Sequence, residues 1–251
     1  MRILYLGNNL VGLRVLGWLR AHGEEIIALV VHPSGRGKFV DDIVSASGLT
    51  AECIIDGSTL SERETLAQIE ALKPDIGVSV LFGYILKRTF LDLLPLGAIN
   101  LHPAYLPFNR GAYPNVWSIV DRTPAGVTLH HIDDGIDTGD IIAQRRVEVD
   151  MTDTGETLYR KLEHASIELF IETWPSIRAG TSARQPQHGS GTFHRARDVE
   201  AIDRIELDGT YTARQLIDLI RARTFPPHKG AYVEHDGRRV YLRLELAEDD
   251  T

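Results

Sequence analysis

The sequence is poor in cysteine and in long apolar runs. Cys53 is its single cysteine, so the chain can form neither an internal disulfide nor a thiolate metal cluster. The most apolar stretches, such as IIALVV at 26–31, are strand-sized and fall well short of the roughly 20 residues that cross a bilayer. Met1 leads directly into RILYLG, without the basic and apolar segments of a secretory signal. We therefore predict a cytoplasmic protein with no membrane partner, in which Cys53 is an inert core residue of the strand-like ECII segment.

Positive charge is also scarce. Asp and Glu outnumber Lys and Arg by 35 to 27, which gives a formal net charge of −8. A phosphate backbone would meet net repulsion from such a chain unless basic residues cluster locally. The best cluster is weak, with Arg214, Arg221 and Arg223 beside Asp218 on one predicted helix, which is typical of a solvated face. We predict no nucleic-acid partner.

The first 180 residues alternate short Val/Ile/Leu-rich runs with helical patterns. This order is typical of βαβ units and predicts an α/β fold with a mostly parallel sheet. The predicted strands lie near 2–6, 26–31, 52–56, 76–82, 97–102, 126–132 and 140–149, and the predicted helices near 9–22, 61–72, 113–121 and 155–174. Ser61 and Glu64 have the spacing of a capping box, which predicts the start of the second helix.

A change of composition divides the chain into three parts. Residues 1–180 form the main domain, and 181–197 are a linker, because AGTSARQPQHGSG at 179–191 is polar and rich in Gly, Ser and Pro. Residues 198–251 form a small C-terminal unit. Its helix is capped by Thr212 and Gln215, and its β-hairpin turns at Asp236-Gly237.

The turn after the first predicted strand has an incomplete dinucleotide-binding pattern. Gly7 and Gly12 do not make GxGxxG, and the acidic residue expected after the next strand is replaced by VVHPSG. We therefore predict no bound NAD, and Gly7 can be explained by a tight turn alone. Asn8 and Asn9 could still donate hydrogen bonds to an anionic ligand at the helix start.

The stretch AINLHPAYLPFNRGAYPNVWSIV at 98–120 combines a strand end with a long irregular loop. Asn100 and His102 are two residues apart, so their side chains project to one face at the carboxyl-terminal edge of the sheet, where α/β proteins bind ligands. A histidine in a strand is more often structural, but the loop that follows has the prolines and polar residues, such as Asn109 and Arg110, that commonly carry binding groups.

A second stretch, GVTLHHIDDGIDTGDIIAQ at 126–144, contains four aspartates between two predicted strands: Asp133, Asp134, Asp137 and Asp140. Two structural readings are a set of turn residues and a divalent-cation loop. The spacing does not match an EF-hand, and the bidentate glutamate is missing. His130 and His131 are adjacent on a strand, so they point to opposite faces and cannot share a site. We predict no metal.

These two stretches together resemble the 10-formyltetrahydrofolate-dependent formyltransferase family. The resemblance rests on Asn100-Leu101-His102-Pro103, then LPFNRGAYP, then Thr128 to Gly139 with Asp137, and it extends over about residues 1–142. It implies a Rossmann-like fold without NAD, 10-formyltetrahydrofolate as formyl donor, and a catalytic trio of Asn100, His102 and Asp137. It also implies a homodimer, and a folate pocket lined by Leu81, Phe82, Gly83, Tyr84, Ile85 and Leu86 together with Asp133, Asp134 and Gly135.

The residue types suit this chemistry independently of the resemblance. Formyl transfer needs an unprotonated amine, a donor to the developing oxyanion and a proton for the departing nitrogen. Asn100 can donate to the oxyanion, and His102 can transfer protons or donate to the same oxygen. A nearby Asp137 would favour the charged imidazole and orient it. A non-catalytic nucleotide-binding module on the same scaffold is the alternative, because fold does not determine function.

Features that other members of this family have, and that this sequence lacks, reduce the number of candidate acceptor amines. A tRNA substrate predicts a basic surface, the glycinamide ribonucleotide enzyme has a different phosphate loop, and the related folate hydrolase carries an N-terminal regulatory domain that we do not expect before Met1. The loop YLPFNRGAYPNVWSI and the segment FPPHKGAYV are similar to those of enzymes acting on dTDP-linked 4-amino-4,6-dideoxy sugars. This similarity implies a role in cell-surface polysaccharide synthesis, such as that of O-antigen, with substrate-binding residues Asn8, Asn9, Arg110, Tyr113, Phe225, Lys229 and Tyr232. Phe225 and Tyr232 could instead anchor the hairpin to the preceding helix.

Overall fold

The computed structural model describes residues 1–33 and 35–247, so the last four residues of the predicted C-terminal unit lie outside it. Its chain forms two compact units. Unit 1 comprises Met1–His102, Thr128–Gln144 and Ser166–Gln187, and unit 2 comprises Pro103–Val127, Arg145–Ala165 and the chain from His188. Each unit is thus assembled from segments that are far apart in the sequence.

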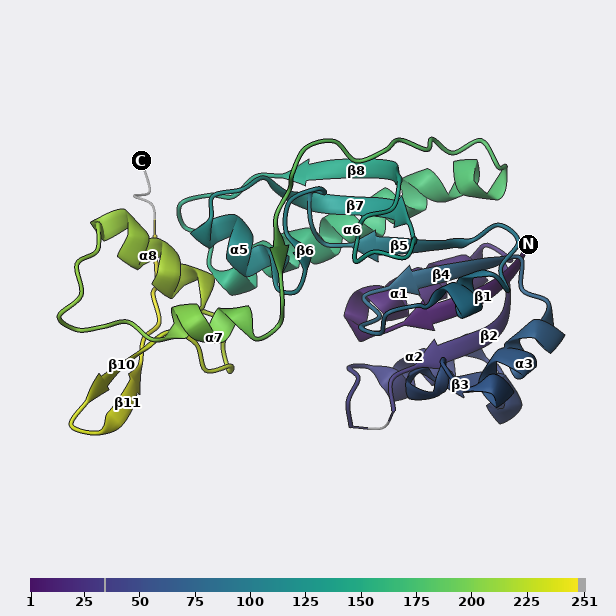
Figure 1. Ribbon diagram of the computed structural model, residues 1–251, viewed down its shortest axis with the longest axis horizontal. Helices are drawn as coiled ribbons and strands as arrows, with labels where there is room; N and C mark the ends of the chain where they lie inside the picture. The colour runs from purple at the N-terminus through teal and green to yellow at the C-terminus, as the bar shows by residue number, and fades with distance from the viewer. Residues whose placement is uncertain (34, 248–251) are drawn as a thin grey trace. The chain divides into compact units, whose positions relative to one another are not determined.

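A seven-stranded sheet is the framework of the fold, and its strands lie in the order β3-β2-β1-β4-β5-β7-β8 (Figure 1). The strands β1 to β5 are parallel neighbours, and β7 pairs antiparallel with β5. The strands are β1 (Arg2–Gly7), β2 (Glu25–Val31), β3 (Ile54–Asp56), β4 (Ile76–Val80), β5 (Ala98–His102), β7 (Ala125–His131) and β8 (Ile141–Val147). The mostly parallel α/β sheet predicted from the sequence is confirmed.

The helices that belong with these strands alternate with them along the chain. They are α1 (Asn9–Ala21), α2 (Val40–Ser47), α3 (Arg63–Leu72), α4 (Arg88–Leu91), α5 (Pro114–Val120) and α6 (Gly155–Arg178), with short 3₁₀ turns at Ala51–Cys53 and Gly57–Thr59. Strand order reverses beside β1, which pairs with β2 on one side and β4 on the other. Open α/β sheets bind ligands in the crevice at such a switch point.

The core of unit 1 lies on the faces of the central strands. Ile3, Leu4 and Leu6 on β1 and Leu29 on β2 are fully buried, as a parallel sheet covered on both faces requires. The carboxyl-terminal half of α6 belongs to the same unit. Trp174 Nε1 donates a buried hydrogen bond of 2.8 Å to Glu24, which satisfies both polar groups.

Two local predictions for unit 1 are wrong. The helix α3 begins at Arg63 with Glu62 as its N-cap and has no side-chain cap, so Ser61 lies one residue too early to form the predicted capping box with Glu64. Cys53 ends a 3₁₀ turn and is only half-buried, so it is not a core residue of a strand. The chain becomes extended only at Ile54, after this turn.

Unit 2 contains the short strands β6 (Arg110–Gly111) and β9 (Phe193–His194), the helices α7 (Asp198–Asp203) and α8 (Ala213–Ala222), and the hairpin β10 (Tyr232–His235) and β11 (Arg238–Tyr241). The predicted capping box of Thr212 and Gln215 and the turn at Asp236-Gly237 are both present. The segment 181–197 is more than a linker, because it supplies β9, which pairs with β6.

Within the described residues, no helix combines the length and the apolar composition needed to cross a membrane.

Candidate active site

Asn100, His102 and Asp137 lie together at the carboxyl-terminal edge of the sheet in unit 1. The strand β5 carries the first two on one face, and the aspartate loop after β7 carries the third. Asp137 Oδ2 is 3.6 Å from His102 Nε2, and Asp137 Oδ1 is 3.5 Å from Asn100 Nδ2. The side chains of His102 and Asp137 are 8% and 14% exposed, so the group is shielded from bulk water yet reachable. An amide, an imidazole and a carboxylate in contact can donate to an anion and move a proton.

Asp137 lies beside Asn100 and His102 because hydrogen bonds within its loop and from Gln187 hold the loop in one conformation. Asp133 Oδ1 accepts hydrogen bonds from the Gly135 amide and the Thr138 hydroxyl, which closes a compact turn. Gln187 donates to the carbonyls of Asp137 and Gly139. A Cβ at Gly139 would lie 1.9 Å from the His131 carbonyl oxygen, so only glycine fits there. These contacts leave the Asp137 carboxylate facing Asn100 and His102.

The other aspartates have different partners. Asp133 is a turn residue, as above, and Asp140 forms an ion pair with Arg184 at 2.8 Å. Turn and surface chemistry therefore accounts for these two, while Asp134 is exposed. In the part of the chain that is described, no group of three or more His, Cys, Asp or Glu side chains is arranged to hold a metal ion.

His130 and Ser79 also belong to the site, and sequence reasoning missed both. His130 is 2% exposed, and its Nε2 lies 3.2 Å from Asn100 Nδ2 and 3.6 Å from Asp137 Oδ1. Ser79 Oγ lies 2.9 Å from Asn100 Oδ1. Both are cross-strand neighbours of Asn100, on β7 and β4 respectively. No sequence pattern states which strands become neighbours or in which register, so composition and spacing carried no signal for them.

His131 has a different environment from His130. Burial lowers the pKa of His131, Arg184 and, to a smaller extent, His130 lower it further, and Asp140 acts in the opposite direction. Its surroundings are thus the Arg184–Asp140 pair rather than the trio. The two adjacent histidines do not converge on one site, in keeping with the alternation of side chains along a strand.

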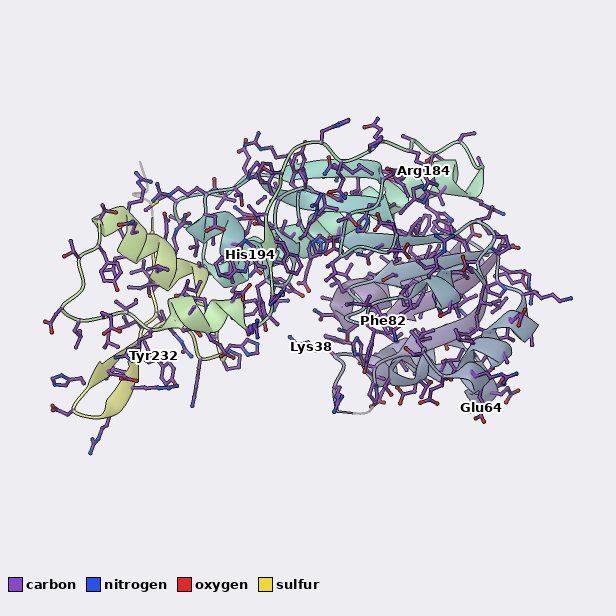
Figure 2. All side chains as sticks on the ribbon, viewed as in Figure 1. Lys38, Glu64, Phe82, Arg184, His194 and Tyr232 are labelled. Carbon is purple, nitrogen blue, oxygen red and sulfur yellow. The ribbon has the colours of Figure 1, made fainter. Side chains whose placement is uncertain are left out.

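The loop after β4, proposed from the family resemblance to line the folate pocket, packs on His32. The rings of Phe82 (labelled in Figure 2) and Tyr84 each lie 5.0 Å from the His32 ring. The Gly83 amide donates to His32 Nε2 at 3.3 Å. Burial lowers the pKa of His32, and Asp56 offsets part of that shift, so a ring nitrogen stays available as an acceptor. Ile85 is 68% exposed, which places an apolar side chain in solvent within this loop.

Asn8 and Asn9 lie in the turn after β1, and the Asn8 side chain forms hydrogen bonds with two neighbouring loops of unit 1. Asn8 Nδ2 donates to the Leu81 carbonyl at 3.3 Å, and Asn8 Oδ1 accepts from the Lys38 amide at 2.8 Å. Asn9 Oδ1 accepts from the Leu10 amide. The turn after β1 is therefore bonded to the loops after β2 and β4. Donation from these side chains to a ligand stays a prediction.

In unit 2, the loop with Arg110 and Tyr113 is built around Asn109. This residue is fully buried, and its side-chain Nδ2 donates to the hydroxyls of Ser118 and Thr123. Its backbone N–H donates to the Thr192 hydroxyl. Arg110 lies in β6, and Tyr113 is 46% exposed at the start of α5 with a positive φ of 56°. The loop is held rigidly, and Tyr113 projects from it.

Phe225, Lys229 and Tyr232 all have neighbours within unit 2. The Phe225 ring lies 5.5 Å from that of Tyr159. Tyr232 (Figure 2) lies 5.9 Å from Tyr241, whose ring also faces the Lys229 ammonium at 5.3 Å. The Tyr159 contact joins Phe225 to α6, and the Tyr241 contact of Tyr232 lies within the hairpin, so neither of these contacts is with the preceding helix α8. A stacking role toward a nucleotide base stays a prediction.

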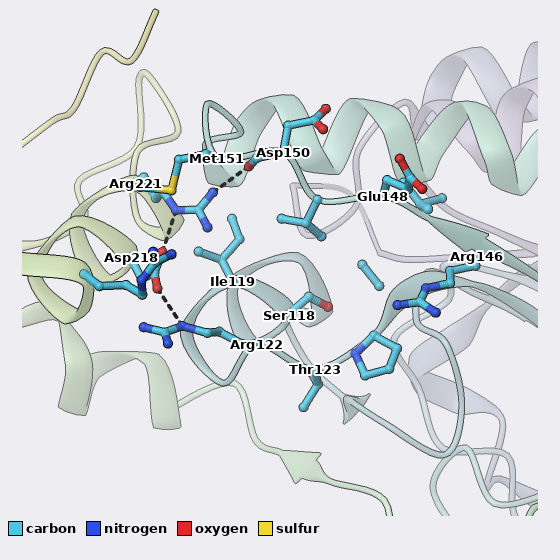
Figure 3. Close-up of a pocket in the computed structure, with 15 residues that line it drawn as sticks. Ser118, Ile119, Arg122, Thr123, Arg146, Glu148, Asp150, Met151, Asp218 and Arg221 are labelled. Carbon is cyan, nitrogen blue, oxygen red and sulfur yellow. Dashed lines mark hydrogen bonds and ion pairs between the residues drawn. The ribbon is translucent and has the colours of Figure 1, made fainter. Parts of the chain in front are cut away.

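A separate pocket of about 690 Å³ lies in unit 2 (Figure 3). The buried Asp218 carboxylate accepts from Arg122 at 3.0 Å and from Arg221 at 2.8 Å, and Arg221 also donates to the carbonyls of Asp150 and Asp153. These bonds fasten α8 to the segment before α6. No residue of the trio lines this pocket.

Comparison with known proteins assigns the chain to a family. Residues 15–174 match the formyl transferase family, and residues 198–248 match the N-formyltransferase dimerization C-terminal domain. The chain belongs to the formyl transferase family. This confirms the prediction that it is an enzyme of the folate-dependent formyltransferase class, with a Rossmann-like domain and a small C-terminal unit.

Similar proteins include a methionyl-tRNA formyltransferase and two formyltransferases of known structure. The methionyl-tRNA formyltransferase of Geobacter metallireducens is 30% identical, over 96% of this chain and 78% of its own length. A 4-N formyltransferase from Francisella tularensis is 26% identical with a TM-score of 0.86, over 99% of this chain and 98% of that one. A formyltransferase from Anoxybacillus kamchatkensis, solved with UDP-4,6-dideoxy-4-formamido-L-AltNAc and tetrahydrofolate, is 31% identical with a TM-score of 0.59, over 80% of this chain and 89% of that one.

Proposed function

We propose that this enzyme transfers the formyl group of 10-formyltetrahydrofolate to the amino group of a nucleotide-linked sugar, with dTDP-4-amino-4,6-dideoxy sugars as the first acceptors to test. The observation that carries the reaction is the contact of Asn100, His102 and Asp137 at the edge of the sheet. Tetrahydrofolate in the related Anoxybacillus structure supports the donor.

The residues of the loop after β4 fit a folate. Ile85 offers an exposed apolar surface, and the Leu81–Leu86 segment is held by Asn8 and His32, so its backbone groups are fixed in direction. The aspartate loop with Asp133, Asp134 and Gly135 is equally well held. A flat ring system with polar edges needs an apolar face and a few fixed polar groups. Bound 10-formyltetrahydrofolate would supply the electrophilic formyl carbon.

The trio then performs three tasks during amine attack. Asn100 Nδ2 donates to the formyl oxygen as negative charge builds on it, which is where a fixed donor lowers the barrier most. His102 takes up or delivers the proton that the amine must lose and the departing nitrogen must gain. Asp137, at 3.6 Å from His102 Nε2, orients the imidazole and stabilises its charged form.

The sugar acceptor rests on the solved relatives and on charge. The Francisella 4-N formyltransferase matches both units of this chain, including the helix and hairpin after residue 198. A tRNA acceptor would have to bind a chain of net charge −8. The residues proposed to contact the nucleotide sugar are those that the sequence predicted: Asn8, Asn9, Arg110, Tyr113, Phe225, Lys229 and Tyr232. We also propose that the reaction takes place in the cytoplasm, in keeping with a single cysteine.

Methionyl-tRNA is the second candidate acceptor, because the curated relatives that share 30–32% identity with this chain carry that name. Glycinamide ribonucleotide, which the sequence also left open, is a third acceptor to test.

An acceptor panel separates these functions. Purified protein with 10-formyltetrahydrofolate is given a dTDP-4-amino sugar, a UDP-amino sugar, glycinamide ribonucleotide or methionyl-tRNA, and tetrahydrofolate release and formylated product are both measured. We expect product with an amino sugar only, and a fall of about 100- to 1000-fold in kcat for Asn100→Ala, the typical loss of one oxyanion donor. Product with tRNA alone would refute the sugar acceptor, and no turnover with any amine would refute the enzyme.

A further inference from the structure

We propose that Ser79 and His130 are positioning residues that set the direction of the Asn100 side-chain amide. This inference rests on the proposed function, in which Asn100 Nδ2 donates to the formyl oxygen. Ser79 and His130 are 3% and 2% exposed, and both contact the amide group of Asn100. They act on the reaction through Asn100 and not by touching the reacting atoms.

A primary amide has no preferred direction from its shape alone. The oxygen and the NH₂ group are nearly the same size, so rotation by a half-turn fills the same space and exchanges a donor for an acceptor. If Asn100 were reversed, its oxygen would face the developing oxyanion and repel it. Hydrogen-bond partners can prevent this if at least one of them can only accept or only donate, and Asn100 has a partner at each end of its amide.

His130 defines the first end. Its Nδ1 lies 2.7 Å from the His131 carbonyl oxygen, and a carbonyl only accepts, so Nδ1 carries the proton. In the neutral ring, Nε2 is then left with a lone pair. That lone pair, 3.2 Å from Asn100, accepts from Nδ2 and would repel Oδ1. A neutral His130 that holds its proton on Nδ1 therefore accepts from Nδ2 and places Nδ2 on the β7 side of the amide.

Ser79 defines the second end. Its hydroxyl lies 2.9 Å from Asn100 Oδ1. A hydroxyl can donate or accept, so Ser79 alone would tolerate either direction of the amide. Once His130 requires Nδ2 on its side, Ser79 must donate to Oδ1, and the two bonds reinforce one direction. The remaining Nδ2 contact, 3.5 Å from Asp137 Oδ1, is long and weak, so that hydrogen is available to an incoming oxygen.

The support is rigid because it is built across three strands. Ser79 on β4 and His130 on β7 are the register partners of Asn100 on β5, on its two sides. Neighbouring strands hold their cross-strand residues at nearly constant separation. The direction of Asn100 is therefore set before any substrate binds, which is the condition for electrostatic preorganisation.

Single variants give the first test. We expect Ser79→Ala to lower kcat roughly 10-fold and His130→Leu roughly 10- to 100-fold, with KM for both substrates within about 2-fold, because a neutral hydrogen bond is lost while binding groups stay in place. His130→Gln should recover part of the loss, since its side-chain oxygen can still accept from Nδ2. Ser47→Ala, which removes another fully buried serine hydroxyl, is the matched control and should leave kcat unchanged. An unchanged kcat in Ser79→Ala and His130→Leu would overturn the proposal.

A double-mutant cycle separates positioning from a general structural effect. In an Asn100→Ala background there is no amide left to orient, so adding Ser79→Ala or His130→Leu should change kcat by less than about 2-fold. If each substitution lowers kcat in this background by the same factor as in the wild type, Ser79 and His130 do not act through Asn100.

A spectroscopic readout is independent of turnover. The side-chain NH₂ resonances of Asn100, assigned by their loss in Asn100→Ala, should shift and broaden in Ser79→Ala and His130→Leu but not in Ser47→Ala. Failure of the wild type to formylate any acceptor would refute the proposed function and leave this measurement valid. Unperturbed Asn100 resonances in both variants would refute the positioning role even if the enzyme is active.

Discussion

Asp137 lies in the left-handed backbone region, with φ of 54°, at the point where the aspartate loop meets Asn100 and His102. This conformation costs about 1 kcal/mol or more for most residues with a side chain, and Asp and Asn tolerate it best. Strain of this kind persists where the surroundings over-determine the backbone, here through Gln187 and the glycine at 139. The residue that carries the proposed charge is therefore placed by its loop.

Asp137→Asn should separate the charge from the backbone conformation. Asparagine has the same shape and tolerates positive φ, so we expect an unchanged Tm and a fall in kcat of about 100-fold or more, because the imidazole loses its anionic partner. Asp140→Asn is the control, since it removes a carboxylate of the same loop that pairs with Arg184 outside the trio, and it should change kcat less than roughly 2-fold. Equal effects of the two substitutions would contradict a specific role for Asp137.

His32 should make the stability of unit 1 depend on pH. Burial lowers its pKa from the ordinary value of 6.5, so the unfolded chain binds a proton in a pH range where the folded chain does not. Its stabilising contribution is complete above the unfolded value and is lost as pH falls through the lower folded value. We expect a smaller fall in Tm between about pH 7.5 and 5.5 for His32→Gln than for the wild type. Exposed His188→Gln should follow the wild type, and identical slopes in all three proteins would exclude His32 as the cause.

At the scale of elements, two helix starts with similar sequence signals behave differently. Thr212 and Gln215 form a complete capping box at α8, whereas Ser61 and Glu64 at α3 do not, because that helix begins at Arg63. We expect Thr212→Ala to lower the free energy of unfolding by about 1 kcal/mol and Ser61→Ala to leave it unchanged within about 0.3 kcal/mol. Urea denaturation of both variants measures the difference. A comparable loss in Ser61→Ala would mean that it caps α3 in solution.

The helix α8 is also fastened by its buried arginine. Arg221 is 6% exposed and bonds Asp218 and the Asp150 carbonyl, as Figure 3 shows. It also donates to the carbonyl of Asp153. Arg221→Met should cost about 3–5 kcal/mol, because it leaves a buried carboxylate and two carbonyls short of a partner. Arg214→Ala, which removes an exposed arginine of the same pocket, should cost less than about 0.5 kcal/mol in the same denaturation experiment. A loss below about 1 kcal/mol for Arg221→Met would show that α8 does not depend on this network.

At the scale of the whole molecule, the homodimer implied by the family resemblance predicts that the β10–β11 hairpin lies in the interface between two copies of the chain. The match of residues 198–248 to a dimerization domain supports association through this part of the chain, and Val240 and Tyr241 are 48% and 38% exposed on β11. We expect sedimentation to show a dimer that Val240→Glu converts to monomer, since a charge would be buried in the interface. Leu207→Glu, at another exposed apolar residue of unit 2, should remain dimeric. A dimer that survives Val240→Glu would place the interface elsewhere.

The sequence by itself determined the alternation of strands and helices, because each strand and helix carries its own hydrophobic period and turn residues. It also determined that Asn100 and His102 lie on the same face of the sheet, since side chains two positions apart on a strand point to the same side. The capping box of α8 and the hairpin turn at Asp236-Gly237 were equally local, and both were predicted.

Only the tertiary structure decided what lies beside these residues. Ser79 and His130 reach Asn100 through the order and register of β4, β5 and β7, which depend on how the whole sheet packs and not on any local pattern. The family resemblance had already named Asp137 among the four aspartates, but contacts from Gln187 and the turn at Asp133 hold its loop beside Asn100 and His102. The segment expected to be a linker forms β9, because it pairs with β6, which is far away in sequence. Local preferences define elements, whereas a site is made by contacts between distant segments, and those contacts exist only in the folded chain.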